Sequence, residues 1–210
     1  MTNNNYMKKN ISFLLLSLFI ALSSICNGNN DKSINIAQVL SDTIPDMCVL
    51  VPPTFVDSLN PFGIIISSNS PDELNTEIYK GCFYRFFNQQ SKRQIAVRLI
   101  KWPSKSEALD EYNMNLKRHH ESWGRSPERI NWVPDSAYFT NNGEEANKCF
   151  DCGLVVLNGL YTIYISFSGD DDGNRERKKT VSLYILERLC ARMPGLTPPQ
   201  MINRQLPINN

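Results

Sequence analysis

Alternating apolar and polar residues predict a β-hairpin in the middle of the chain. Side chains alternate with a period of two over residues 82–87 and again over 95–100, which places every second side chain on one face of a strand. The polar stretch 88–92 lies between the two runs and would form the turn. We therefore expect two antiparallel strands here.

A second hairpin is predicted further along the chain. Two strand-like runs, 154–157 and 160–167, flank Asn158-Gly159, a dipeptide whose left-handed backbone conformations suit a type I′ turn. A further short strand is predicted over 137–140. One face of the second hairpin would carry Tyr161, Ile163, Ile165 and Phe167.

Helical patterns separate and follow these strands. Ser104 and Glu107 match a capping box, and apolar residues then recur at helical spacing as far as Trp123. A short helix is predicted over 53–59, after a proline pair, and a long closing helix ends at Pro194. The sequence thus predicts an α+β fold: an antiparallel sheet of about five strands built from two hairpins, with one short and two long helices packed on it.

The N-terminal residues 1–28 have the three-part layout of a secretory signal. Lys8 and Lys9 precede a largely apolar run over 11–22 that contains no charged residue, and small and polar residues follow. The run is about a dozen residues long, too short for a hydrocarbon core that needs about 20. We therefore expect export to the periplasm, the outer envelope or the extracellular space.

Two kinds of processing remain open for this segment. Residues 22–26 resemble a bacterial lipoprotein cleavage site, at which Cys26 would be lipidated, but Ile25 departs from that pattern. An ordinary signal-peptide cut after Cys26 or Gly28 would leave small residues at the two positions before the cut that define such a cleavage site. Cys26 is therefore a candidate lipidation site, and a lipid there would be the expected route to a membrane.

Composition predicts three segments after the signal, and the net charge argues against one class of partner. A polar tether is expected over 29–44, a single α+β domain over 45–194 and a tail rich in Pro and Asn over 195–210. The chain has 22 Lys+Arg and 21 Asp+Glu, and loss of the two signal lysines leaves a net charge of −1. A near-neutral domain argues against a nucleic-acid partner.

Cysteines are the most informative chemical groups after the signal. Cys48 lies before the first short helix and Cys82 in the first strand, so a disulfide between them would pin the entry of the domain to the sheet. Cys149 and Cys152 have the spacing of a thiol redox pair, but a strand follows them where an oxidoreductase would have a helix. The alternatives are a local Cys149–Cys152 bridge, or one of the two paired with Cys190.

Other residues that bind metals or do catalysis are sparse. His119 and His120 are the only histidines, and as neighbours on a helix they point to different sides. The acidic run 170–172 lacks the calcium-loop spacing and is better explained by a turn before a helix capped by Asp172 or Asn174. No phosphate-binding loop, G-x-S-x-G or H-E-x-x-H motif occurs. We expect no metal, cofactor or catalytic set.

Four short patterns can be compared with a known family: Cys48 followed by Leu50 and a helix at 56–59, Gly81-Cys82-Phe83-Tyr84, residues 106–112 and residues 133–138. With these patterns, the order of predicted elements over about residues 46–193 resembles that of small envelope lipoproteins of the PsbP-like superfamily. That resemblance implies a non-enzymatic accessory or binding role. The extra Cys149 to Cys152 pair departs from the pattern.

Three functions follow as hypotheses. The leading one is an exported, non-catalytic binding or accessory protein of the cell envelope, with an envelope ligand or protein as its partner. The second is a thiol-disulfide oxidoreductase that uses Cys149 and Cys152. The third is a structural envelope protein, which would have no saturable ligand.

Overall fold

The computed structural model describes residues 44–87, 89, 91–123, 126–131, 135–140, 151–169 and 174–199. Over these ranges the chain is an α+β fold with seven strands and four helices, so the expected counts of about five strands and three helices were too low. Among these helices, none is long and apolar enough to cross a membrane.

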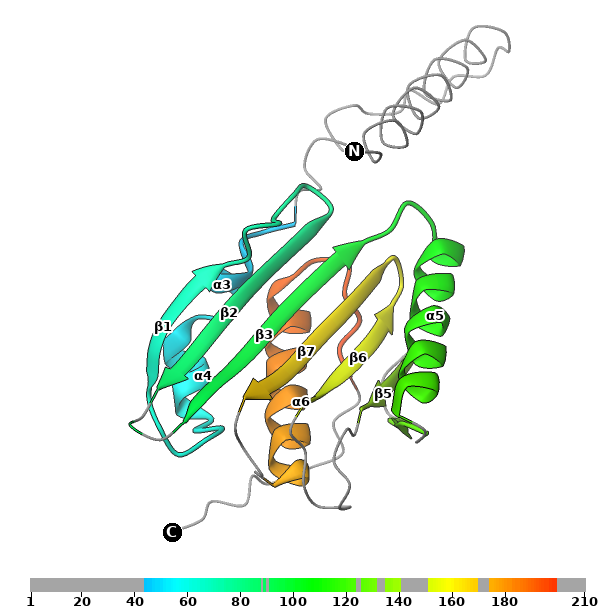
Figure 1. The fold of residues 1–210 in the computed structure, drawn as a ribbon. Coiled ribbons are helices and arrows are strands. Elements are labelled where there is room, and N and C mark those ends of the chain that lie inside the picture. The colour runs from blue at the N-terminus through cyan, green and yellow to red at the C-terminus, as the bar shows by residue number, and fades with distance from the viewer. Residues whose placement is uncertain are drawn as a thin grey trace, which may run out of the picture. The chain divides into compact units, whose positions relative to one another are not determined.

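All seven strands form one antiparallel sheet in the order β1-β2-β3-β7-β6-β5-β4 (Figure 1). Each predicted hairpin supplies two neighbouring strands, and β3 pairs with β7 to join the hairpins in the centre. The strands are β1 (Ile66–Pro71), β2 (Tyr79–Phe87), β3 (Lys92–Lys101), β4 (Glu128–Arg129), β5 (Ser136–Phe139), β6 (Cys152–Asn158) and β7 (Tyr161–Gly169).

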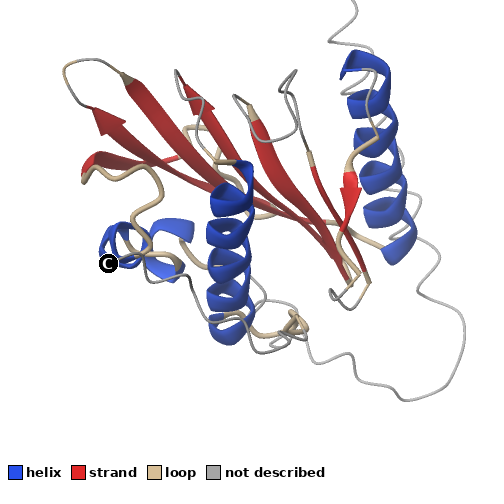
Figure 2. Cartoon of the chain, turned by 90° about the horizontal axis from the view of Figure 1, so that it is seen from below, coloured by secondary structure: helices blue, strands red, loops and turns tan. Residues whose placement is uncertain are grey.

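The helices cover the two faces of the sheet unequally. Three of them, α3 (Met47–Leu50), α4 (Pro53–Ser58) and α6 (Arg175–Arg192), lie on one face, and α5 (Lys105–Trp123) lies alone on the other (Figure 2). The α5 helix packs on β6 and β7, toward one side of the sheet. Among the described residues, no helix lies on the opposite half of that face, over β1, β2 and β3.

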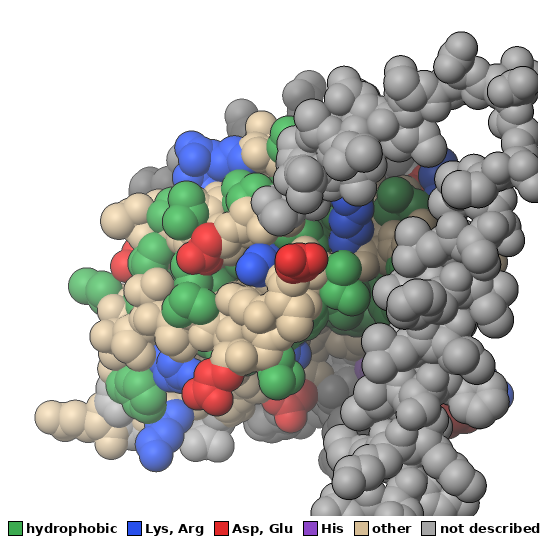
Figure 3. All heavy atoms as spheres, turned by 90° about the horizontal axis from the view of Figure 1, so that it is seen from above, with side chains coloured by type: hydrophobic (Ala, Val, Ile, Leu, Met, Phe, Trp, Pro, Cys, Tyr) green, Lys and Arg blue, Asp and Glu red, His purple; other side chains and the backbone are tan. Residues whose placement is uncertain are grey.

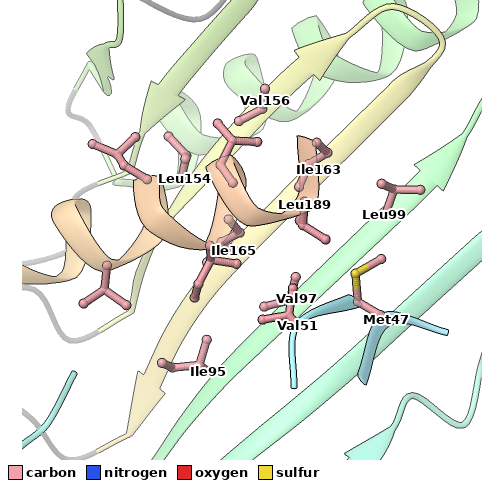
Figure 4. Packing of buried hydrophobic residues seen from close by; sticks show 14 of the residues in the cluster. Met47, Val51, Ile95, Val97, Leu99, Leu154, Val156, Ile163, Ile165 and Leu189 are labelled. Carbon is pink, nitrogen blue, oxygen red and sulfur yellow. The ribbon is translucent and has the colours of Figure 1, made fainter. Parts of the chain in front are cut away.

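The main core lies between the sheet and the three helices. Alternate side chains of the central strands point to this face, as a period of two requires, and α6 adds a row of apolar side chains that includes Leu189 (Figure 4). The smaller cluster under α5 consists of Ala108, Tyr112, Tyr138, Val155 and Leu157.

The helix-capping residues that the sequence predicts start the helices in the structure. Ser104 accepts a hydrogen bond from the backbone N–H of Glu107 at 3.2 Å and donates to its carboxylate at 3.0 Å, which starts α5. Asn174 caps α6 by accepting from the N–H groups of Glu176 and Arg177. A helix begins at Pro53, as the proline pair predicts.

The predicted type I′ turn is wrong by one residue. Asn158 pairs with Tyr161, so the two loop residues are Gly159 and Leu160, and among the described residues of this turn only Gly159 has a positive φ, of 62°. Glycine at the first central position is the mark of a type II′ turn. Asn158 is therefore the last residue of β6, and its side chain is buried.

The folded part of the chain extends slightly past its predicted limits. Ile44 and Leu196 are both buried in the main core, although one was placed in the tether and the other in the tail. The side chain of Asn158 holds the later segment by accepting from the N–H of Thr197 at 3.0 Å and donating to its carbonyl at 2.8 Å. Residues 1–43 and 200–210, with the predicted signal and most of the tether and tail, lie outside the described residues.

Candidate functional site

A groove of about 880 Å³ lies on the sheet face that α5 covers only in part. Strands β1, β2 and β3 form one side of it, and α5 with β7 forms the other. Concave surfaces of this size that combine apolar and polar side chains are the usual location of small-ligand sites. This groove is therefore the candidate functional site.

Gly81 lies beneath the polar cluster of the groove. It pairs with Arg98 across β2 and β3, and its carbonyl accepts from the N–H of Asp72 at 2.9 Å. A Cβ atom at Gly81 would lie 2.9 Å from the Cβ of Asp72 and 3.3 Å from the Cγ of Arg98. The absence of a side chain is what lets those two residues come together over the strand.

Asp72 is the centre of this cluster. The residue is buried, with 7% of its surface exposed. Its carboxylate accepts hydrogen bonds from the Tyr79 hydroxyl at 2.5 Å and from the backbone N–H of Leu74 at 3.0 Å. The Nε atom of Arg98 lies 3.5 Å from the same carboxylate. Burial alone would raise the pKa of Asp72, but these donors and the charge of Arg98 together hold it below its usual value. Asp72 is therefore ionised at neutral pH.

Tyr79 has the opposite perturbation. Burial and its hydrogen bond to Asp72 raise the pKa of Tyr79 to about 12. The hydroxyl therefore stays protonated and is occupied as a donor to Asp72. This pair orders the groove wall, and at neutral pH its proton stays on the Tyr79 oxygen.

Phe83 carries two guanidinium groups on the same wall. The Cζ of Arg98 lies 5.1 Å from the centre of the Phe83 ring and that of Arg85 lies 5.6 Å from it. Both distances are within the range of cation–π contacts. Arg85 also donates to the hydroxyl of Ser70 at 2.8 Å. The two arginine side chains are thus held in place against an aromatic surface.

The opposite wall is formed by α5 and β7. The amide of Asn115 donates to the carboxylate of Glu111 at 2.6 Å and to the hydroxyl of Tyr164 at 3.0 Å. Burial is the main cause that raises the pKa of Tyr164, so this hydroxyl is neutral as well. One wall of the groove therefore carries Arg85 and Arg98 together with Asp72 and Glu73, and the opposite wall carries Glu111.

The predicted cysteine residues lie away from this groove. A disulfide joins Cys48 in α3 to Cys82 in β2, as the sequence favoured, with their Cα atoms 5.2 Å apart. Cys190 in α6 is a free thiol, so the alternative bridge from Cys190 to Cys149 or Cys152 is not formed. Cys190 is also buried, and burial raises the pKa of its thiol to about 11. Cys152, at the start of β6, is disulfide-bonded and only 2% exposed. Cys26 and Cys149 lie outside the described residues.

The other candidate residues show no ligand site. His119 is half-buried, and burial, with the adjacent His120, lowers its pKa, while His120 is exposed. Over the described ranges no three His, Cys, Asp or Glu side chains gather in a way that could hold a metal ion. The acidic run 170–172 lies outside those ranges.

Sequence reasoning did not find the groove residues. They come from four strands, the loop between β1 and β2, and one helix, and no short motif joins them. One signal was present: Arg85 and Arg98 occupy the outward-facing positions of two alternating strands, opposite the core-facing Tyr84 and Val97. The pattern identified the face but could not show that α5 leaves half of it open.

No protein-family model, no curated protein and no solved structure matches this chain. The resemblance to the PsbP-like superfamily therefore stays a prediction, and the functional argument is built on the geometry of the groove.

Proposed function

We propose that this chain is an exported, non-catalytic binding protein of the cell envelope that holds a small ligand in the groove beside α5. The observation that carries the proposal is the groove itself, in which ordered polar groups surround an accessible aromatic side chain. Two of the carboxylates there already accept hydrogen bonds from groove side chains: Asp72 from Tyr79, and Glu111 from Asn115. Such an arrangement favours recognition over proton transfer.

The thiol-disulfide alternative has less support. A reactive cysteine needs an accessible sulfur whose thiolate is stabilised, commonly at a helix N-terminus. Cys152 instead begins a strand, is buried and is disulfide-bonded. We therefore place this bond in a structural role.

Export remains part of the proposal. It is supported by the signal-like layout of residues 1–28, and the Cys48–Cys82 disulfide is compatible with an oxidising compartment. On the face shown in Figure 3, acidic, basic and hydrophobic side chains are interspersed, an arrangement that fits a small-molecule ligand better than a polyanion.

The groove can be tested with a neutral fluorescent probe, N-phenyl-1-naphthylamine, titrated against the protein. We expect saturable binding that is lost when Asn115→Trp fills the groove from α5. The matched control is Asn113→Trp, because Asn113 is exposed on the same helix and does not line the groove. The expected ratio of dissociation constants between the two variants is at least about tenfold.

Two results would contradict the proposal. One is the absence of saturable probe binding, which would instead favour the structural envelope protein. The other is equal binding by the two tryptophan variants, which would place the probe elsewhere. Near-UV circular dichroism of each variant checks that the tertiary packing is intact.

A further inference from the structure

Five charged side chains line the groove: Arg85, Arg98, Asp72, Glu73 and Glu111. Of the two arginines, Arg98 has a carboxylate partner and Arg85 has none among the described residues. Arg98 has the carboxylate of Asp72 3.5 Å from its Nε atom. Arg85 has only the neutral hydroxyl of Ser70 and the Phe83 ring as partners, and no carboxylate of the described residues contacts it. Two guanidinium groups therefore share one aromatic ring with a single counter-ion between them.

This arrangement favours an anion beside Arg85. Like charges on one ring repel each other, and a bound anion would relieve that repulsion while the ring and Ser70 already hold the guanidinium in place. Arg85 is half-buried, so its charge is screened less than that of an extended surface arginine. A guanidinium also matches the geometry of a carboxylate with two parallel hydrogen bonds.

The α5 wall disfavours a second negative charge. The carboxylate of Glu111 lines the groove and accepts a hydrogen bond from the amide of Asn115 at 2.6 Å. An anionic group near α5 would be repelled by Glu111. The bound anion would therefore be directed to the β1–β2 side.

Apolar groups belong to both walls. Phe83 and Ile100 line the groove on one wall and the ring of Tyr164 on the other, and Leu74, which also lines it, is 73% exposed. Flat rings stack favourably on such surfaces, and burial of exposed apolar groups such as Leu74 adds affinity.

We propose that the groove selects an organic monoanion with a flat apolar body, an inference that rests on the proposed function. The anionic group binds at Arg85 and Ser70, and the apolar body lies across Phe83 toward Tyr164. The class is that of aromatic monocarboxylates. Arg85 is the residue that determines specificity for charge, and Phe83 supplies the surface for the ring.

Three probes that share one ring system test this assignment: 2-naphthoate, 2-naphthalenemethanol and 2-naphthylmethylammonium, each titrated by calorimetry against the full chain. We expect the carboxylate to bind at least about tenfold more tightly than the alcohol, and the ammonium compound to bind most weakly. Arg85→Gln should remove the advantage of the carboxylate and leave the affinity for the alcohol unchanged. Arg192→Gln, at an exposed position on the opposite side of the sheet, is the control for net charge and should change nothing.

The outcomes separate this inference from the proposed function. Equal binding of the three probes, a preference for the ammonium compound or an unchanged preference in Arg85→Gln would overturn the assignment of an anion. In those cases the groove remains a binding site if Asn115→Trp still blocks the neutral probe. If none of the three probes binds, and N-phenyl-1-naphthylamine does not bind either, both proposals fail.

Discussion

Asp72 shows how a single side chain can organise a surface. Its carboxylate takes hydrogen bonds from Tyr79 and the Leu74 backbone and lies beside Arg98, and all of these contacts depend on the missing side chain of Gly81. Glycine in a strand interior weakens the strand, so its presence here is explained by the close approach of the two side chains above it. The same residues order one wall of the groove.

The lowered pKa of Asp72 predicts a defined pH dependence of stability. Because the folded-state pKa lies below the unfolded value of about 3.9, the ionised group stabilises the fold above that pH, and this contribution is lost as the pH falls through the folded-state pKa. We expect Asp72→Asn to lower the free energy of unfolding by about 1–3 kcal/mol at neutral pH, and the difference from the native chain to shrink below about pH 4.

Urea unfolding at a series of pH values measures this effect. Asp110→Asn is the control, because Asp110 is exposed on α5, and it should change the unfolding free energy by less than about 0.5 kcal/mol. The difference in unfolding free energy between Asp72→Asn and the native chain should depend on pH. If it stays constant from neutral to acidic pH, the ionised form of Asp72 contributes nothing to stability.

At the scale of elements, the sequence pattern located the strands with a buried face and missed the edges. The edge strand β1 has mostly exposed, polar residues, and β4 has two residues, so neither has an alternating pattern to detect. The four-residue helix α3 is too short to show a helical period. The turn between β6 and β7 was misplaced because the dipeptide signal does not specify the register; the pairing of Asn158 with Tyr161 does.

The start of α5 gives a prediction at this scale. Ser104→Ala removes the side-chain acceptor for the N–H of Glu107 and should lower the free energy of unfolding by about 1 kcal/mol. Ser106→Ala makes the same chemical change at an exposed position in the first turn of the helix, where alanine has the higher helix propensity, so it should be neutral or slightly stabilising. Chemical denaturation of the two variants compares them directly, and equal losses would argue against a capping role.

At the scale of the whole molecule, long-range contacts close the fold around its core. The Cys48–Cys82 disulfide joins α3 to β2, and the Tyr84 hydroxyl donates to the Val51 carbonyl on the same side of the sheet. At the other end, Asn158 holds the backbone of Thr197 after α6. Both ends of the described domain are thus attached to the sheet.

The disulfide should be a large single contribution to stability. It closes a loop with a sequence separation of 34 residues, for which the chain-entropy estimate is about 4 kcal/mol. We expect Cys48→Ala with Cys82→Ala to lower the free energy of unfolding by about that amount. Cys190→Ala removes a buried thiol that forms no bridge and should cost clearly less.

Thermal unfolding with and without a reductant distinguishes the loss of the bridge from the loss of two side chains. The reductant should lower the midpoint temperature of unfolding more in the native chain and in the Cys190→Ala variant than in the double variant, which lacks the Cys48–Cys82 bond. An equal shift in all three would assign the effect of reduction to the bond at Cys152.

The sequence by itself determined the class of the fold and the core-facing side chains. Strand alternation, a helix cap and apolar rows are local properties, and each persists in the structure because the period of a strand or a helix decides which side chains are buried. The Cys48–Cys82 bridge was also favoured, because the two cysteines flank the entry to the sheet.

Only the tertiary structure decided the order of the strands, the two edges and the groove. The groove exists because α5 packs on β6 and β7 and, in the described part of the chain, no other helix covers β1, β2 and β3 on that face, so residues as distant as Asp72, Arg98 and Asn115 line one cavity. That placement is set by the packing of whole elements, which no local pattern encodes. The charge of Arg85 could be read from the sequence, but only the fold shows that no carboxylate of the described residues contacts it.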